Sequence, residues 1–164
     1  MDRSVTNDDS LREHLVRLLA WEDAHVSYDT AVRDLEPHLR GATPAGLPYS
    51  PWQLVEHLRL TQNDILDFCL NPDYKDRSWP DDYWPSSALP PSDAAWQGSV
   101  RGFTEDREAL RALALNREVH LEARIPHGSG QTYLRELLLV ADHSTYHVGE
   151  LVVVRRLLGS WPPK

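Results

Sequence analysis

The sequence predicts an all-α protein, a four-helix bundle that forms one domain over residues 1–164. Four long segments repeat apolar residues at the three- and four-residue spacing of an amphipathic helix. Each segment follows a serine or threonine, residues that are typical of helix N-caps. Alternating apolar and polar residues, which are typical of strands, are nearly absent apart from residues 119–125.

The first predicted helix covers residues 11–36. Apolar side chains recur at helical spacing from Leu11 to Leu35. Ser10 is the expected N-cap, and Pro37 stands where the pattern stops.

The second predicted helix begins at Ser50-Pro51-Trp52-Gln53, which combines a capping box with proline at the first helical position. It ends near Asn71-Pro72, because a residue that precedes proline disfavours helical geometry. Its apolar face consists of Leu54, Val55, Leu58, Ile65, Leu66 and Cys69.

The third predicted helix begins after Ser92 and runs through Leu113. The fourth runs from Thr132 to about Leu158, where glycine and proline follow. The middle of this fourth segment is apolar almost all the way round, which predicts a helix buried on most sides.

A long connection separates the second and third helices. Residues 71–91 contain five prolines and four large aromatic side chains, so we expect an ordered functional loop in preference to a linker. This connection is long enough to cross the bundle. An up-down-up-down order is therefore not required, and the two middle helices could be parallel.

The composition argues against several classes of function. The net charge is −8 and no run of basic residues exceeds Arg155-Arg156, which disfavours a nucleic-acid partner because such binding depends on cationic contacts. The longest apolar runs, residues 137–141 and 151–154, are far shorter than the roughly 20 residues of a membrane span. The lone Cys69 and the acidic N-terminal residues predict a cytoplasmic protein without an internal disulfide.

Two histidines in the fourth helix have the spacing of a metal-binding pair. His143 and His147 are four residues apart, so their rings stand one above the other and could bind one ion. The alternative, that they are ordinary core or surface histidines, stays open on spacing alone. Neutral histidines that are buried together need hydrogen-bond partners, which favours a specific arrangement.

His57 lies at the edge of the apolar face of the second helix, one turn before Thr61. A lone histidine at a helix seam is usually a hydrogen-bonded packing residue. Together with His143 and His147, it would complete a three-nitrogen site that leaves coordination positions for water or substrate, as in catalytic zinc sites.

The order of these motifs resembles the DinB/YfiT-like superfamily of metal-dependent enzymes. The motifs are a histidine, His57, after the capped Pro51-Trp52 start, and the His143/His147 pair followed by Gly-Glu-Leu. The resemblance covers nearly the whole chain. It implies an up-down-down-up bundle with a divalent metal ion held by His57, His143 and His147.

The resemblance also implies a class of activity, because similar proteins include bacillithiol S-transferases and mycothiol-dependent maleylpyruvate isomerases. We therefore expect a small-thiol-dependent S-transferase that acts on electrophilic small molecules. The aromatic side chains of the connection over residues 71–91 are expected to form one wall of an apolar pocket. Zn²⁺ or Ni²⁺ is the first expectation for the metal, Mn²⁺ or Fe²⁺ the second, and a low-molecular-weight thiol is the expected cosubstrate. A metal bound by three neutral imidazoles can also activate water, so a metal-dependent hydrolase is one alternative and a non-enzymatic metal-binding or interaction module is another.

We further expect a homodimer. Six tryptophans are more than one small core readily buries, and the resemblance implies pairing. Light scattering at micromolar concentration checks this expectation.

Other polar residues have weaker signals. Glu150, one turn beyond His147, is the candidate catalytic residue, either orienting an imidazole or acting as a base for bound water; a solvated or ion-paired glutamate is the alternative. His25 forms the one E-x-x-H motif with Glu22, too few for a di-iron carboxylate site, although it could still face the pocket. His127 lies in a predicted turn. Cys69 is expected to be a buried, inert thiol in preference to a nucleophile.

Overall fold

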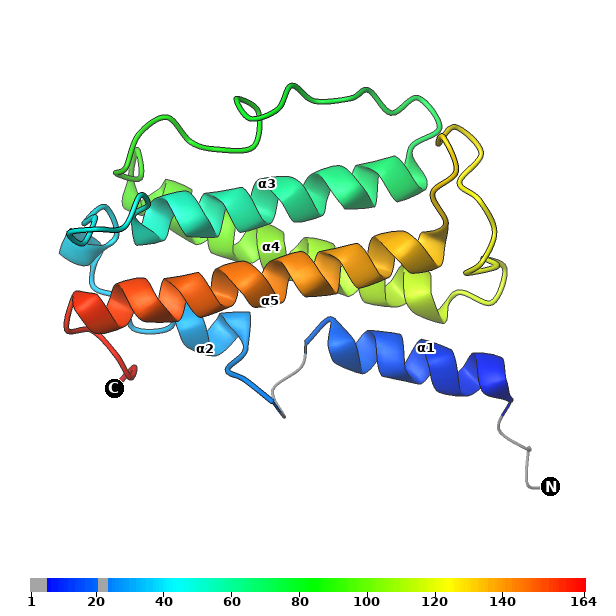
Figure 1. The fold of residues 1–164 in the computed structure, drawn as a ribbon, viewed down its shortest axis with the longest axis horizontal. Helices are drawn as coiled ribbons and strands as arrows, with labels where there is room; N and C mark the ends of the chain where they lie inside the picture. Colours follow the sequence, from blue (N-terminus) through cyan, green and yellow to red (C-terminus); the bar gives the residue numbers. More distant parts are fainter. Residues whose placement is uncertain (1–5, 21–23) are drawn as a thin grey trace.

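The computed structural model describes residues 6–20 and 24–164, which form helices and no β-strand (Figure 1). The elements are α1 (Asn7–Leu18), α2 (Tyr28–Val32), the short 3-10 helix η1 (Pro37–Leu39), α3 (Pro51–Leu70), α4 (Asp93–Leu115) and α5 (Tyr133–Leu157). The extended geometry expected near residues 119–125 is limited to one isolated bridge between Arg124 and Thr132. None of the described helices is long and apolar enough to span a bilayer.

The prediction of a single helix over residues 11–36 is wrong, because this part of the chain contains two helices, α1 and α2. Thr6, and not Ser10, caps α1, and its hydroxyl accepts a hydrogen bond from the Asp9 amide (3.1 Å). A second cap, Ser27, begins α2. Trp21, Glu22 and Asp23, which belonged to the predicted helix, lie outside the described residues.

α1 and α2 bury their apolar side chains in different parts of the core. Leu15 of α1 packs in a cluster with Leu137, whereas Val32 of α2 packs in the cluster that contains Leu58. Arg155 of α5, which is 1% exposed, donates a hydrogen bond to the Ala31 carbonyl (2.7 Å) and ties α2 to α5. Helical periodicity shows which face of a helix is apolar but not which part of the core that face contacts. The apolar residues of α1 and α2 therefore read as one continuous helix in the sequence.

The three longer helices follow the predicted caps. The Ser50 side chain accepts from the Gln53 amide in a capping box, and α3 ends at Asn71. Ser92 and Thr132 cap α4 and α5 with a single side-chain hydrogen bond each, accepted from the amides of Ala95 and Arg135. These boundaries are confirmed because capping is decided by residues within one turn of each other.

The long helices pack side by side (Figure 1). α3 packs against both α4 and α5, while α1 packs against α4 and α5. Figure 1 shows α3 and α4 running in the same direction, because residues 71–92 travel back along the bundle between them, and α1 and α5 running in the opposite direction. α3 and α5 are therefore antiparallel neighbours, and side chains near the middle of each face one another.

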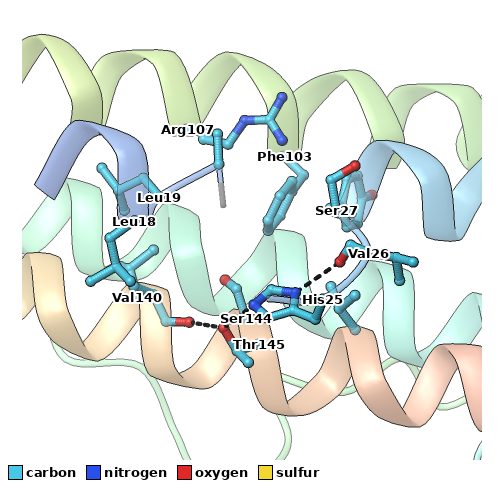
Figure 2. Close-up of a pocket in the computed structure, with 14 residues that line it drawn as sticks. Leu18, Leu19, His25, Val26, Ser27, Phe103, Arg107, Val140, Ser144 and Thr145 are labelled. Carbon is cyan, nitrogen blue, oxygen red and sulfur yellow. Dashed lines mark hydrogen bonds between the residues drawn. The ribbon is translucent and has the colours of Figure 1, made fainter. Parts of the chain in front are cut away.

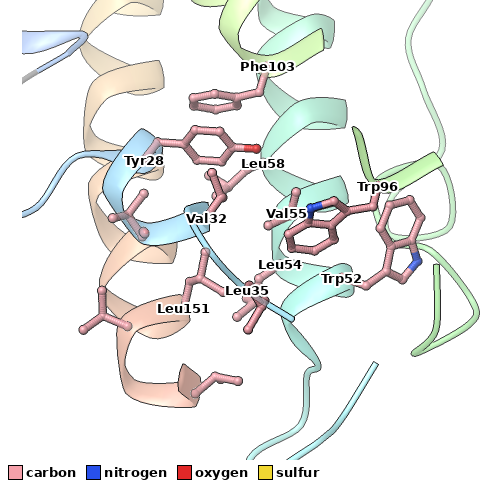
Figure 3. Packing of buried hydrophobic residues seen from close by; sticks show 14 residues of the cluster. Tyr28, Val32, Leu35, Trp52, Leu54, Val55, Leu58, Trp96, Phe103 and Leu151 are labelled. Carbon is pink, nitrogen blue, oxygen red and sulfur yellow. The ribbon is translucent and has the colours of Figure 1, made fainter. Parts of the chain in front are cut away.

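A buried cluster at one end of the bundle fixes the separation of these helices (Figure 3). Leu54 and Leu58 of α3 and Leu151 of α5 have no exposed surface. Burial of each such side chain contributes about 1.5–3 kcal/mol. Leu58 follows His57 in the chain and Leu151 lies one turn after His147, so the packing of the core also holds the backbones that carry these histidines.

Replacing Ser50 with alanine tests how the start of α3 is joined to the loop of residues 71–92. The Ser50 hydroxyl accepts from Gln53 and also donates to the Ala88 carbonyl (2.6 Å). We expect a loss of about 1–2 kcal/mol in the free energy of unfolding, measured by urea denaturation. Ser92→Ala is the matched control, because the Ser92 side chain caps α4 and has no such loop bond; an equal loss in both variants would contradict the anchoring role.

Candidate metal centre

The structure brings His57, His143 and His147 together between α3 and α5. The Nε2 atom of His57 lies 3.1 Å from Nε2 of His143 and 3.2 Å from Nε2 of His147. One ligand atom from each residue lies within 4.8 Å of the others. The ring pair on α5 and the single ring on α3 thus point at a common position.

The spacing of these nitrogen atoms fits a coordinated ion. Two imidazole nitrogens bound at the zinc–nitrogen distance of about 2.0–2.1 Å in a tetrahedron lie about 3.3 Å from each other. The separations of 3.1 and 3.2 Å from His57 match this value. The three residues therefore fit a divalent metal without any large rearrangement.

Hydrogen bonds at the other ring nitrogens assign the tautomers. Nδ1 of His57 donates to the Tyr83 carbonyl (2.8 Å), and Nδ1 of His147 donates to Oε2 of Glu150 (2.6 Å). The Thr61 hydroxyl donates to the His57 carbonyl (2.8 Å), so its oxygen faces Nδ1 of His143 (3.4 Å) as an acceptor. With each proton on Nδ1, the three Nε2 atoms present lone pairs.

Three converging lone pairs at this separation repel one another unless a cation lies between them. The arrangement also has the acceptors that orient metal-bound histidines in proteins, since each ring donates its second N–H to a carbonyl, a carboxylate or a hydroxyl. The donor set and its hydrogen bonds therefore have the chemistry of a metal site.

Burial keeps two of the imidazoles in the neutral form that binds metal. Burial lowers the pKa of His57 to about 4, with a smaller contribution from His147. Burial lowers the pKa of His143 to about 3, and the neighbouring His147 and His57 rings act in the same direction. Both rings are uncharged at neutral pH, so protons compete weakly with a metal ion for their Nε2 atoms.

The loop of residues 71–92 covers one side of the cluster. The Trp84 ring stacks on the His57 ring with 3.7 Å between ring centroids. The Tyr49 ring also stacks on Trp84, with 4.1 Å between ring centroids. These contacts confirm the prediction of an ordered loop. They also limit access of water to the His57 ring.

Asp64 anchors this loop, and its role was not predicted from the sequence. It is a buried carboxylate on α3 that accepts hydrogen bonds from the Tyr83 hydroxyl (2.7 Å) and the Tyr74 hydroxyl (3.0 Å). Arg77 pairs with the same carboxylate (3.2 Å). Asp64 lies seven residues after His57, which places both residues on the same side of α3. An acidic residue at this otherwise apolar face was the sequence signal that could have identified Asp64 as the loop anchor.

No family model, curated protein or solved structure matches this chain.

The candidate metal group consists of three residues, His57, His143 and His147. Within residues 6–20 and 24–164, no fourth histidine, cysteine, aspartate or glutamate joins the group. A structural zinc site is usually closed by four protein ligands, whereas a catalytic site keeps a position for an exchangeable ligand. Three donors would therefore leave a coordination position open for an exchangeable ligand.

The other predicted residues lie away from this cluster. His25 is exposed and lines a small pocket with Phe103, Val140 and Thr145 (Figure 2); its motif partner Glu22 lies outside the described residues. His127 is exposed in a turn, where Nε2 donates to the Phe68 carbonyl (2.8 Å). Neither histidine contributes to the metal group.

Cys69 is 4% exposed, and burial raises the pKa of its thiol to about 12. A thiol with such a pKa is protonated at neutral pH and is a poor nucleophile. This agrees with the prediction of an inert, buried cysteine.

Glu150 contacts the ring nitrogen of His147 that faces away from the cluster. This contact corresponds to the orienting role considered from the sequence, and it makes Glu150 a positioning residue. We expect Glu150→Ala to weaken metal affinity about 10- to 100-fold, with a smaller loss for Glu150→Gln, which keeps an acceptor. Competition with a chromophoric chelator measures the change.

Asp142→Ala supplies the control for this experiment, because Asp142 is an exposed carboxylate on the same helix. Its metal affinity should equal that of the wild type. Equal affinities for Glu150→Ala and the wild type would show that the His147 ring is held without the carboxylate.

Proposed function

We propose that the centre of His57, His143 and His147 binds one divalent metal ion, with Zn²⁺ or Ni²⁺ expected first, and that the protein is a metal-dependent enzyme. The observation that supports this most directly is the convergence of three histidine Nε2 atoms with no fourth protein ligand among the described residues. Such a donor set leaves a coordination position for a reacting ligand.

We propose that the reaction is transfer of a small thiol to an electrophilic small molecule. When bound, a divalent metal supplies a Lewis acid that lowers the pKa of a coordinated thiol. The histidines hold that ion through neutral imidazoles, Glu150 and the Tyr83 carbonyl orient two of the rings, and Trp84 covers one side of the site. The Glu150 carboxylate accepts the hydrogen bond from His147 and is therefore not free to act as a general base. A water nucleophile often needs such a base, whereas a thiolate does not, and this favours a thiol.

The fold supports the same proposal. The helix directions in Figure 1 agree with the up-down-down-up order of the DinB/YfiT-like superfamily. The single histidine lies in the first of the two parallel helices and the pair lies in the last helix, as in the resemblance drawn from the sequence. We propose membership of this superfamily on these grounds.

The activity is tested by incubating metal-loaded protein with chlorodinitrobenzene-type and epoxide electrophiles in the presence of bacillithiol, mycothiol, glutathione or coenzyme A. Ester and amide substrates without thiol are assayed in parallel. We expect thiol-dependent turnover that persists at pH 6–7, where a free thiol with a pKa of about 8.5 is mostly protonated. His143→Ala should abolish this turnover.

The parallel assays separate the proposal from its alternatives. Thiol-independent hydrolysis that disappears in His143→Ala would identify a metal-dependent hydrolase. Absence of turnover with every substrate, while the metal stays bound, would identify a non-enzymatic metal-binding module.

A further inference from the structure

One face of α5 has no partner among the described helices. Figure 1 shows α3 on one side of α5 and α1 and α2 on the other, and each of the three packs against it. Four large apolar side chains of α5 nevertheless stay between 45% and 64% exposed. They are Leu138, Tyr146, Val153 and Leu157. Their spacing places them on one side of the helix, so they form a continuous apolar face.

Gly149 lies in the middle of this face, between Tyr146 and Val153. Glycine destabilises the interior of a helix relative to other residues. A Cβ atom at this position would meet no heavy atom within 4 Å, so the packing of one chain does not require glycine here. Glycine on an exposed apolar face allows the backbone of a second helix to approach closely.

The charged residues of the face are arranged symmetrically about Gly149. Asp142 lies seven residues before it and Arg156 seven residues after it, and both are exposed. Neither side chain forms an ion pair within residues 6–20 and 24–164. If two copies of α5 cross antiparallel at Gly149, Asp142 of each copy faces Arg156 of the other. A parallel pairing would place like charges opposite each other, so the charges favour the antiparallel one.

We propose that this face of α5 is the interface of a homodimer, in which two copies of α5 pack antiparallel about a two-fold axis at Gly149. The partner is a second copy of this chain, because the same face supplies both members of the charge pair, as an isologous contact requires. The tryptophans that suggested a homodimer from the sequence take no part, since none lies in α5.

An apolar pocket adjoins the proposed interface. Its volume is about 160 Å³, and Leu47, Leu54 and Val154 belong to its walls. Val153 belongs both to these walls and to the exposed face. In the antiparallel pairing, Tyr146 of the second copy lies opposite Val153, so its ring contacts apolar surface that one chain alone leaves open.

Replacement of Gly149 with glutamate tests the crossing point, because it brings two side chains with like charges together at the two-fold axis. Gly98→Glu is the matched control. A Cβ atom at Gly98, in α4, also meets open space, with Nη2 of Arg101 as its nearest neighbour at 4.0 Å. Both replacements exchange glycine for a better helix former, so the helix content measured by circular dichroism should be retained.

Sedimentation velocity at about 1–100 μM protein measures the Kd of the dimer. We expect the wild type and Gly98→Glu to dimerise with equal Kd. Gly149→Glu should raise the Kd at least about 10-fold, because like charges at an interface oppose association.

A charge exchange tests the antiparallel register. Asp142→Arg alone sets two arginines opposite each other at both ends of the contact, and Arg156→Asp alone sets two aspartates there. Each single variant should raise the Kd about 10-fold. The double variant, Asp142→Arg with Arg156→Asp, restores opposite charges and should return the Kd to near the wild-type value.

Three results would overturn the proposal. The first is a wild type that stays monomeric at about 100 μM. The second is a dimer whose Kd is the same in Gly149→Glu and in the wild type, since the contact would then lie elsewhere. The third is a double variant that dimerises no better than the single charge variants, which would contradict the antiparallel pairing.

Discussion

Alanine at any one of His57, His143 or His147 is expected to remove the metal ion from the purified protein. Loss of a residue that only orients a ligand weakens metal binding about 10- to 100-fold, so loss of a ligand itself should exceed about 100-fold. The three Nε2 atoms converge on one position. Replacing any one of the three histidines with alanine therefore leaves only two donor atoms for the metal. Metal content per chain after mild dialysis measures the effect.

His25→Ala and His127→Ala are the controls for these variants. Both histidines are exposed and neither belongs to the metal group, so one ion per chain should be retained. Full occupancy in His57→Ala, His143→Ala or His147→Ala would show that the residue concerned is not a ligand.

Addition of the metal is expected to raise the melting temperature by about 10 °C. A ligand that binds only the folded state, at a free concentration about 1,000 times its Kd, stabilises by about 4 kcal/mol. For a domain of this size each kcal/mol shifts the midpoint by about 2–4 °C. His57 and His143 are 86 residues apart in the chain, so the unfolded state does not bring the three nitrogens together.

Thermal unfolding in Zn²⁺, Ni²⁺ and Mn²⁺, with a chelator as reference, measures this stabilisation. His143→Ala should show no comparable rise with any of the three ions. A rise of equal size in His143→Ala would place the stabilising ion elsewhere, and an unchanged midpoint in the wild type would contradict the metal centre.

Local sequence signals predicted much of the fold and the residues of the candidate centre. The caps of α3, α4 and α5 are Ser50, Ser92 and Thr132, as expected. A cap acts on amides within the same turn, so its effect can be recognised from a few neighbouring residues. The spacing of His143 and His147 is equally local, because helical geometry alone places side chains four residues apart on one face.

The division between α1 and α2 could not be predicted in this way. Both Ser10 and Thr6 are acceptable caps, and the apolar residues on either side of Ser27 continue a helical pattern. The outcome depends on Leu15 and Val32 joining different clusters of the core. Those contacts are made with α3, α4 and α5, and periodicity carries no information about them.

By itself, the sequence determined the helical class, the boundaries of the three long helices and the identity of the three candidate ligands. The tertiary structure alone decided that His57 meets His143 and His147, that the Tyr83 carbonyl and Glu150 direct their tautomers, and that Asp64 anchors the covering loop. The physical reason is one of range. Helix caps and helix faces follow from interactions within a few residues, whereas the site depends on contacts between segments that only the packed core brings together.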